Sequence, residues 1–141
     1  MRAAAAVAGV AAAFALATTP ASAVTGVNVG TSARGGWNDH CNYTGAYGCL
    51  YYSPNGAGGI FEGYGYYADL SGYTFSDGHS VRNNAASIGN ATTNCNSTTW
   101  VSPHSGGDYN WVSSGRGGNL TSSNPVLRNN EASFDATASC T

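Results

Sequence analysis

The chain has 141 residues, of which five are Arg or Lys and seven are Asp or Glu, so its formal net charge is −2. A chain with so little positive charge cannot neutralise many phosphates, which excludes nucleic acid as the expected partner. Aromatic residues make up 11% of the sequence and charged residues only 9%, a balance typical of folded rather than disordered chains.

Residues 1–23 have the pattern of a secretory signal peptide. Arg2 precedes the small apolar run Ala3–Ala17, and an Ala-x-Ala cleavage site follows that ends at Ala23. The apolar run is too short to span a bilayer, and no later stretch and no basic amphipathic helix indicates membrane binding. We therefore expect a secreted, extracellular protein in which residues 24–40 form a flexible, glycine-rich N-terminal lead-in.

Residues 41–141 are expected to form a single all-β domain. Short aromatic and β-branched runs alternate with turns of Gly, Pro, Asn and Ser, and no window keeps apolar residues at helical spacing. This pattern favours two packed sheets in a sandwich or barrel. The predicted strands are 50–52, 60–61, 64–67, 73–75, 98–101 and 109–112, and the predicted turns are 53–56, 77–78, 102–107 and 113–118.

The chain contains an internal repeat. A first block, Arg82-Asn83-Asn84-Ala85-Ala86-Ser87-Ile88, recurs as a second block, Arg128-Asn129-Asn130-Glu131-Ala132-Ser133-Phe134. Upstream, Tyr51-Tyr52-Ser53-Pro54-Asn55 is echoed at nearly the same spacing by Trp100-Val101-Ser102-Pro103-His104. Two pairs at nearly one spacing predict two copies of one supersecondary unit, over about residues 49–92 and 95–137. A four-strand unit present twice suggests two Greek keys.

Four cysteines follow the signal, which predicts two disulfides in an oxidising compartment. Three pairings are open, and we favour Cys41–Cys49, which closes a short loop, and Cys95–Cys140, which ties the second repeat to the C-terminus. A zinc site is the weaker alternative because no Cys-x-x-Cys pair is present.

These motifs resemble a known family. The segments Cys49–Tyr52, Val81–Ser87 and Asn129–Ser133 are similar to the actinobacterial secreted peptidase inhibitors typified by a metalloproteinase inhibitor with a βγ-crystallin-like fold. The resemblance implies a disulfide-stapled β-sandwich of two Greek keys and a secreted protease as partner. The family's reactive loop is bounded by a disulfide in the second half, whereas here no cysteine lies between Cys95 and Cys140, so no reactive bond can be assigned.

The two blocks also resemble the calcium signature of the βγ-crystallins, except that Ile88 and Phe134 replace its last Ser. The candidate residues supply backbone carbonyls, amide or carboxyl groups and hydroxyls, the oxygen ligands that calcium prefers. Asn carries no charge, so we expect weak affinity at most. The alternative is structural, because Asn and Ser side chains hold tight turns and Ile88 and Phe134 then point inward. The candidate ligands are Asn83, Asn84, Ala85, Ser87, Asn129, Asn130, Glu131 and Ser133.

No catalytic constellation stands out. Asp39-His40, His79 and His104 are isolated candidates, and no zinc-protease, serine-hydrolase or phosphate-loop motif occurs. The Cys41–Cys49 loop, with Tyr43 and Tyr47, is either a binding loop or only a staple for the N-terminus. The aromatic residues form core pairs or, alternatively, a sugar-binding row; they are Tyr64, Tyr66, Tyr67, Tyr73, Trp100 and Trp111.

The sequence thus predicts a monomeric peptidase inhibitor that acts by binding and is not an enzyme. The alternative is a calcium-binding extracellular structural or surface-binding module. Neither function requires a cofactor.

Overall fold

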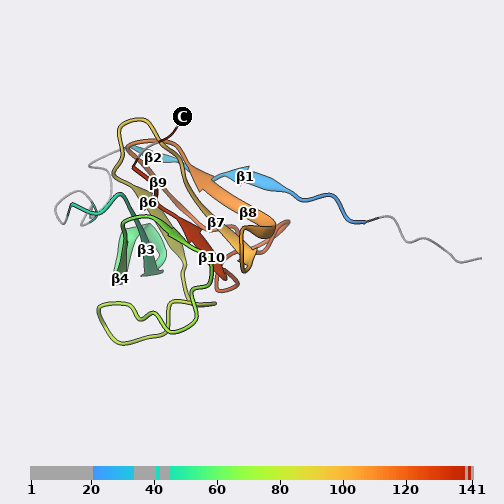
Figure 1. The fold of residues 1–141 in the computed structure, drawn as a ribbon, viewed down its shortest axis with the longest axis horizontal. Helices are drawn as coiled ribbons and strands as arrows, with labels where there is room; N and C mark the ends of the chain where they lie inside the picture. The colour runs from blue at the N-terminus through green and yellow to red at the C-terminus, as the bar shows by residue number, and fades with distance from the viewer. Residues whose placement is uncertain (1–20, 34–40, 42–44, 139, 141) are drawn as a thin grey trace, which may run out of the picture.

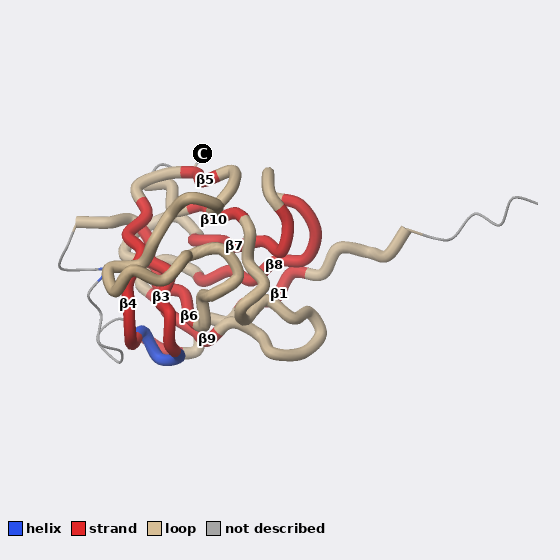
Figure 2. Tube along the Cα trace, turned by 90° about the horizontal axis from the view of Figure 1, so that it is seen from below, coloured by secondary structure: helices blue, strands red, loops and turns tan. Residues whose placement is uncertain are grey.

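The computed structural model describes residues 21–33, 41, 45–138 and 140. In this part of the chain almost every regular element is a strand (Figure 1). The strands are β1 (Gly26–Asn28), β2 (Ser32–Ala33), β3 (Gly48–Ser53), β4 (Ala57–Gly63), β5 (Tyr66–Tyr67), β6 (Ser87–Asn90), β7 (Ser97–Ser102), β8 (Gly106–Val112), β9 (Arg116–Asn119) and β10 (Ser133–Asp135). A single 3₁₀ turn, η1 (Pro54–Gly56), connects β3 to β4 and is drawn in blue in Figure 2.

The strands form two five-stranded sheets. The first sheet has the order β1-β8-β7-β10-β5, and the second has the order β2-β9-β6-β3-β4. The first repeat supplies β3, β4 and β6 to the second sheet but places β5 in the first. The second repeat supplies β7, β8 and β10 to the first sheet but places β9 in the second. Each repeat therefore completes its partner's sheet with one exchanged strand.

One apolar core lies between the sheets. Leu50 and Ile88 reach it from the second sheet, and Val112 and Phe134 reach it from the first; all four side chains are fully buried. Two glycines of the second sheet make room for the Phe134 ring, because a Cβ on Gly48 or Gly63 would lie 3.2 or 2.7 Å from it. Ile88 and Phe134 therefore point inward, as the structural interpretation of the two blocks requires.

The two disulfides join Cys41 to Cys49 and Cys95 to Cys140, which is the pairing favoured from the sequence. The first bridge belongs to a second, smaller cluster on the outer face of the second sheet, where Tyr51 is only 1% exposed. Disulfides that persist are typical of secreted proteins. Among the residues that the structure describes, no helix is long and apolar enough to cross a membrane.

The N-terminal lead-in differs from the expectation. The signal peptide lies outside the described residues except for 21–23, and 34–40 lie outside them too. Residues 24–33, expected to be loose, contain β1, which pairs with β8, and β2, which pairs with β9. Val29 between them is buried in the core. One apolar side chain makes no periodic pattern, so the burial of Val29 could not be predicted from the sequence.

A predicted turn is also partly wrong. Residues 113–118 were expected to form a turn, but Arg116–Asn119 form β9. Gly117 and Gly118 suggested a turn. In the structure Gly118 is glycine because the backbone of Val29 packs against it, and a Cβ at this position would lie 1.6 Å from the carbonyl oxygen of Val29. In the opposite sense, the predicted strand at 73–75 is reduced to an isolated bridge between Thr74 and Ser80.

Candidate functional site

The two asparagine blocks meet each other across the middle of the molecule. The backbone N–H of Asn83 donates to the carbonyl oxygen of Glu131 (2.9 Å), and the N–H of Asn129 donates to the carbonyl oxygen of Ala85 (2.8 Å). Asn83 and Asn129 both have a left-handed backbone, with φ of 60° and 57°. Asn adopts this conformation more readily than most residues. The left-handed backbone that these reciprocal bonds accompany explains why the first residue of each repeated Asn pair is Asn.

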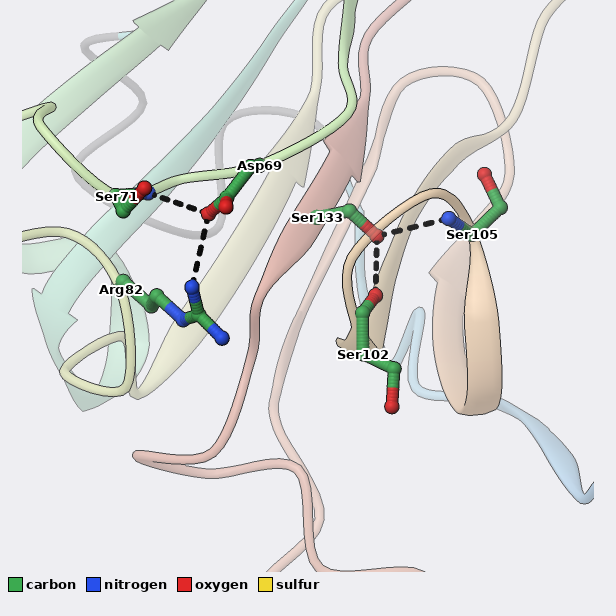
Figure 3. Close-up of polar contacts among 6 residues, drawn as sticks. All are labelled: Asp69, Ser71, Arg82, Ser102, Ser105 and Ser133. Atoms are coloured by element: carbon green, nitrogen blue, oxygen red, sulfur yellow. Dashed lines mark hydrogen bonds and ion pairs between the residues drawn. The ribbon is translucent and has the colours of Figure 1, made fainter.

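The serine of each block, Ser87 or Ser133, holds the hairpin turn of its own repeat. The Ser133 hydroxyl donates to the Ser102 carbonyl (2.7 Å) and accepts from the N–H of Ser105 (3.1 Å), as Figure 3 shows. In the first repeat, the Ser87 hydroxyl donates to the Ser53 carbonyl (2.7 Å) and accepts from the N–H of Gly56 (3.1 Å). Both serines are fully buried. Their hydroxyls therefore satisfy backbone groups in the tight turns of both hairpins.

Glu131 breaks the symmetry of the two blocks. Its side chain is fully buried, and one carboxylate oxygen accepts from the N–H groups of Asn84 (2.7 Å) and Ala85 (2.6 Å). The other oxygen accepts from the N–H of Asn130 (3.1 Å). Burial raises the pKa of the Glu131 carboxyl to about 7, although these backbone hydrogen bonds act in the opposite direction. The second block thus holds the first through an acid that titrates near neutrality.

The candidate calcium ligands are brought together, but internal hydrogen bonds engage them. The carbonyls of Ala85 and Glu131 accept the reciprocal bonds, and both serine hydroxyls are bonded to their hairpins. The side-chain amides of Asn84 and Asn130 donate to the carbonyls of Arg82 (3.2 Å) and Val126 (3.0 Å). No group of three or more His, Cys, Asp or Glu side chains gathers around one point in the described residues. These bonds use the amide nitrogens of Asn84 and Asn130 and one lone pair of each carbonyl, so they do not by themselves exclude an ion, and calcium binding stays a sequence-based hypothesis.

The histidine candidates lie apart from one another. The exposed side chains of His79 and Asp77 lie side by side (Nδ1 to Oδ1, 3.1 Å), and the His79 ring stacks on Tyr52 with ring centroids 4.2 Å apart. His104 lies in the β7–β8 hairpin with φ of 57°, and its backbone N–H donates to the carbonyl of Ala68. Asp39 and His40 lie outside the described residues. Asp77 also accepts from the N–H of Gly59 (3.1 Å), so its carboxylate connects the turn that carries His79 to the start of β4.

An ion pair lies within the first repeat, between Asp69 and Arg82, and is also drawn in Figure 3. Arg82 of the first block donates through Nη1 to Oδ1 of Asp69 (3.0 Å), and the same oxygen accepts from the N–H of Ser71 (2.8 Å). The Ser71 bond leads the causes that lower the pKa of Asp69, and Arg82 adds to them. Because both side chains are partly exposed, solvent screens this pair and its contribution to stability is small.

The sequence did not single out the loop after β9. The carbonyl oxygen of Thr121 accepts from the N–H groups of both Leu127 and Arg128 (2.9 Å each), which closes the loop at its base. The buried side chain of Asn110 in β8 supports it, because its Oδ1 accepts from both the backbone N–H (2.9 Å) and the hydroxyl (3.1 Å) of Thr121. Between the two buried residues Pro125 and Leu127, the side chain of Val126 is 50% exposed.

The equivalent loop of the first repeat is different. It is closed in the same way, since the N–H of Val81 donates to the carbonyl of Tyr73 (3.0 Å). Its apolar residue, Phe75, is 2% exposed and faces the core. The apolar run Pro125-Val126-Leu127 beside Asn124 was the available sequence signal for the exposed loop. The loop that the sequence offered for binding, Cys41–Cys49, carries Tyr47 at 38% exposure, and Tyr43 lies outside the described residues.

No known protein family, curated protein or solved structure matches this chain.

Proposed function

We propose that this protein is a secreted, βγ-crystallin-like domain of two Greek keys that inhibits an extracellular peptidase. Three features support the crystallin-like part of the proposal. The repeats exchange the strands β5 and β9, serines at equivalent positions fix both hairpins, and the two blocks bond each other reciprocally. The sequence resemblance to the secreted peptidase inhibitors agrees with this architecture.

The single observation that carries the inhibitor proposal is the loop from Thr121 to Arg128. A peptidase inhibitor must present a short segment that enters the active-site cleft without a large loss of conformational entropy. The backbone N–H groups of Thr121, Leu127 and Arg128 make three of the hydrogen bonds that hold this loop, and the Thr121 hydroxyl lies within hydrogen-bond distance of both Asn110 Oδ1 and the Pro125 carbonyl. The Val126 side chain is nevertheless half exposed, as a residue that fills a specificity pocket must be.

The chemistry of the loop defines the partner. An exposed Val fits an apolar pocket, and the neighbouring residues Ser122, Ser123 and Asn124 are exposed, small and polar. We therefore propose as target a secreted endopeptidase that accepts an aliphatic side chain next to the scissile bond. Neither a bound metal nor a cofactor on the inhibitor is needed for this mechanism, because the inhibitor contributes only shape and rigidity.

The proposal is tested by titrating secreted metallo- and serine endopeptidases of aliphatic specificity with the folded protein. We expect stoichiometric inhibition of at least one of them and slow cleavage of the loop. Val126→Asp should weaken that inhibition at least about 100-fold, the effect typical of an interface residue at the centre of binding. Val24→Asp is the matched control, because Val24 is also an exposed valine, at 62%, and lies outside the loop.

Two results would refute the proposal. One is full proteolysis of the loop without inhibition, which would make the protein a substrate. The other is equal inhibition by the wild type and Val126→Asp at unchanged thermal stability, which would place the inhibitory surface elsewhere.

A further inference from the structure

The outer faces of the two sheets are treated differently. In the second sheet Tyr51 pairs with Ile60 across β3 and β4, and the cluster around the Cys41–Cys49 bridge covers Tyr51. In the first sheet Trp100 and Tyr109 take the equivalent places across β7 and β8. Both are partly exposed, and within the described residues neither belongs to an apolar cluster. Trp100 and Tyr109 therefore lie on an outer face that no apolar cluster covers among these residues, while the turn of the β7–β8 hairpin covers Ser133 in the same register.

A continuous row of side chains crosses this outer face. The strand registers place five residues opposite one another, and directly opposed residues project from the same face. Their chain neighbours Phe134, Thr99 and Asn110 are fully buried and point to the core, so the row points outward. Neighbouring strands lie about 4.8 Å apart, so a row over five strands is roughly 19 Å long. In order across β5, β10, β7, β8 and β1 the row is Tyr66, Asp135, Thr98, Trp111 and Asn28.

The aromatic rings beside and within the row are held in place. The Tyr66 hydroxyl is within hydrogen-bond distance of the Ser105 hydroxyl (3.0 Å). The Tyr109 ring lies over β1, because a Cβ on Gly26 would be 2.1 Å from its Cζ atom. The Trp100 and Tyr109 rings are 6.3 Å apart and tilted by 39°. Gly26 thus leaves the space in which Tyr109 lies, and the rings form a broad aromatic surface next to the row.

From this arrangement we propose that the outer face of the first sheet binds a non-anionic polysaccharide, with a preference for one that carries amino groups. A sugar ring has an apolar C–H face, which packs on an aromatic ring, and hydroxyl groups at its edge, which need hydrogen-bond partners. The row offers both, because Asp135 and Thr98 lie between the aromatic residues Tyr66 and Trp111, and Asn28 follows Trp111. A purely apolar protein surface would remove water from the polar side chains of the row, which is costly even though Asp135 and Asn28 accept internal hydrogen bonds from the Thr137 hydroxyl and the Gly30 N–H.

The charge of the row selects among polysaccharides. Asp135 is the charged residue in the row, and no cation belongs to it. Complementary charge favours a bound amine and disfavours a carboxylated or phosphorylated glycan. The length of the row suits an oligosaccharide rather than a single sugar. This site is separate from the proposed inhibitory loop and does not depend on peptidase inhibition.

The test is a titration of the full secreted chain with three 1,4-linked oligosaccharides, in which binding is measured by calorimetry and by tryptophan fluorescence. The probes are an oligomer of glucosamine, an oligomer of glucose and an oligomer of galacturonate. We expect saturable binding in that order, with no binding of the galacturonate oligomer. Trp111→Ala should weaken binding of the first two at least tenfold, and Tyr47→Ala, which removes an exposed aromatic side chain outside the row, should leave it unchanged.

A second variant keeps the result interpretable if Trp111→Ala folds poorly. Asp135→Asn should remove the preference for glucosamine over glucose and retain binding of both, because only the charge is lost. The proposal is overturned by absence of saturable binding of both non-anionic oligomers, by equal binding of the galacturonate oligomer, or by unchanged affinity in folded Trp111→Ala.

Discussion

The buried carboxyl of Glu131 makes the stability of the protein dependent on pH. Burial raises its pKa in the folded protein from the ordinary value of 4.5 to about 7. Below the lower value the group is protonated in both states and no penalty arises. Between the two values the unfolded chain loses the proton while the folded protein retains it, so the free energy of unfolding falls as pH rises. Above the folded pKa the loss is complete.

The size of this effect follows from the shift. One pKa unit corresponds to about 1.4 kcal/mol, so a shift from 4.5 to about 7 lowers the free energy of unfolding by about 3 kcal/mol between pH 4 and pH 8. We propose urea unfolding of the wild type and of Glu131→Gln across this range. The amide keeps an oxygen to accept from the N–H groups of Asn84 and Ala85 but cannot ionise.

The informative quantity is the difference between the two proteins at each pH. Other titrating groups affect both equally, so the difference isolates Glu131. The wild type should lose stability relative to Glu131→Gln as pH rises through the window. A difference that is flat, or that grows in favour of the wild type at high pH, would refute the reasoning. It would mean that the three backbone N–H bonds outweigh burial and hold the carboxylate ionised.

Two further predictions concern the repeated blocks. Ser133→Ala leaves the carbonyl of Ser102 and the N–H of Ser105 without their partner, and should lower the free energy of unfolding by about 1–3 kcal/mol in urea, as should Ser87→Ala. Exposed Ser123→Ala is the control, and losses below about 0.5 kcal/mol in both buried variants would contradict the hairpin role. Millimolar calcium is expected to leave the midpoint of thermal unfolding unchanged, because the Asn ligands carry no charge and no acidic cluster gathers in the described residues. A rise that chelation reverses, and that Asn84→Ala combined with Asn130→Ala abolishes, would establish a metal site.

Much of the β-architecture could be predicted from the sequence because it follows from local patterns. Aromatic alternation located β3, β4, β7 and β8, and the short spacing of Cys41 and Cys49 favoured the first bridge. The repeat correctly placed Ser87 and Ser133 in equivalent roles. These features depend on the periodicity of side chains or on matching segments within one chain.

What the sequence could not indicate depends on contacts between distant segments. Val29 crosses so close to β9 that Gly118 must be glycine, and nothing near either residue reports the other. The role of Asn110 as the support of the 121–128 loop is equally invisible, because its partner Thr121 lies in another element. For Glu131, a charged residue in an exposed-looking turn motif gave no reason to expect complete burial.

The exchange of β5 and β9 has a consequence for how the chain can come apart. If the first repeat separated from the second, it would remove β5 from the first sheet and leave the second sheet without β9. Neither half can therefore open without breaking strand pairs in both sheets, and the same pairs would join the two fragments produced by a cut near residues 93–94. A single repeat made alone would lack the strand that the other repeat supplies, and a second copy of the same repeat would have to provide it. The chain therefore has the form of a dimer joined into one polypeptide.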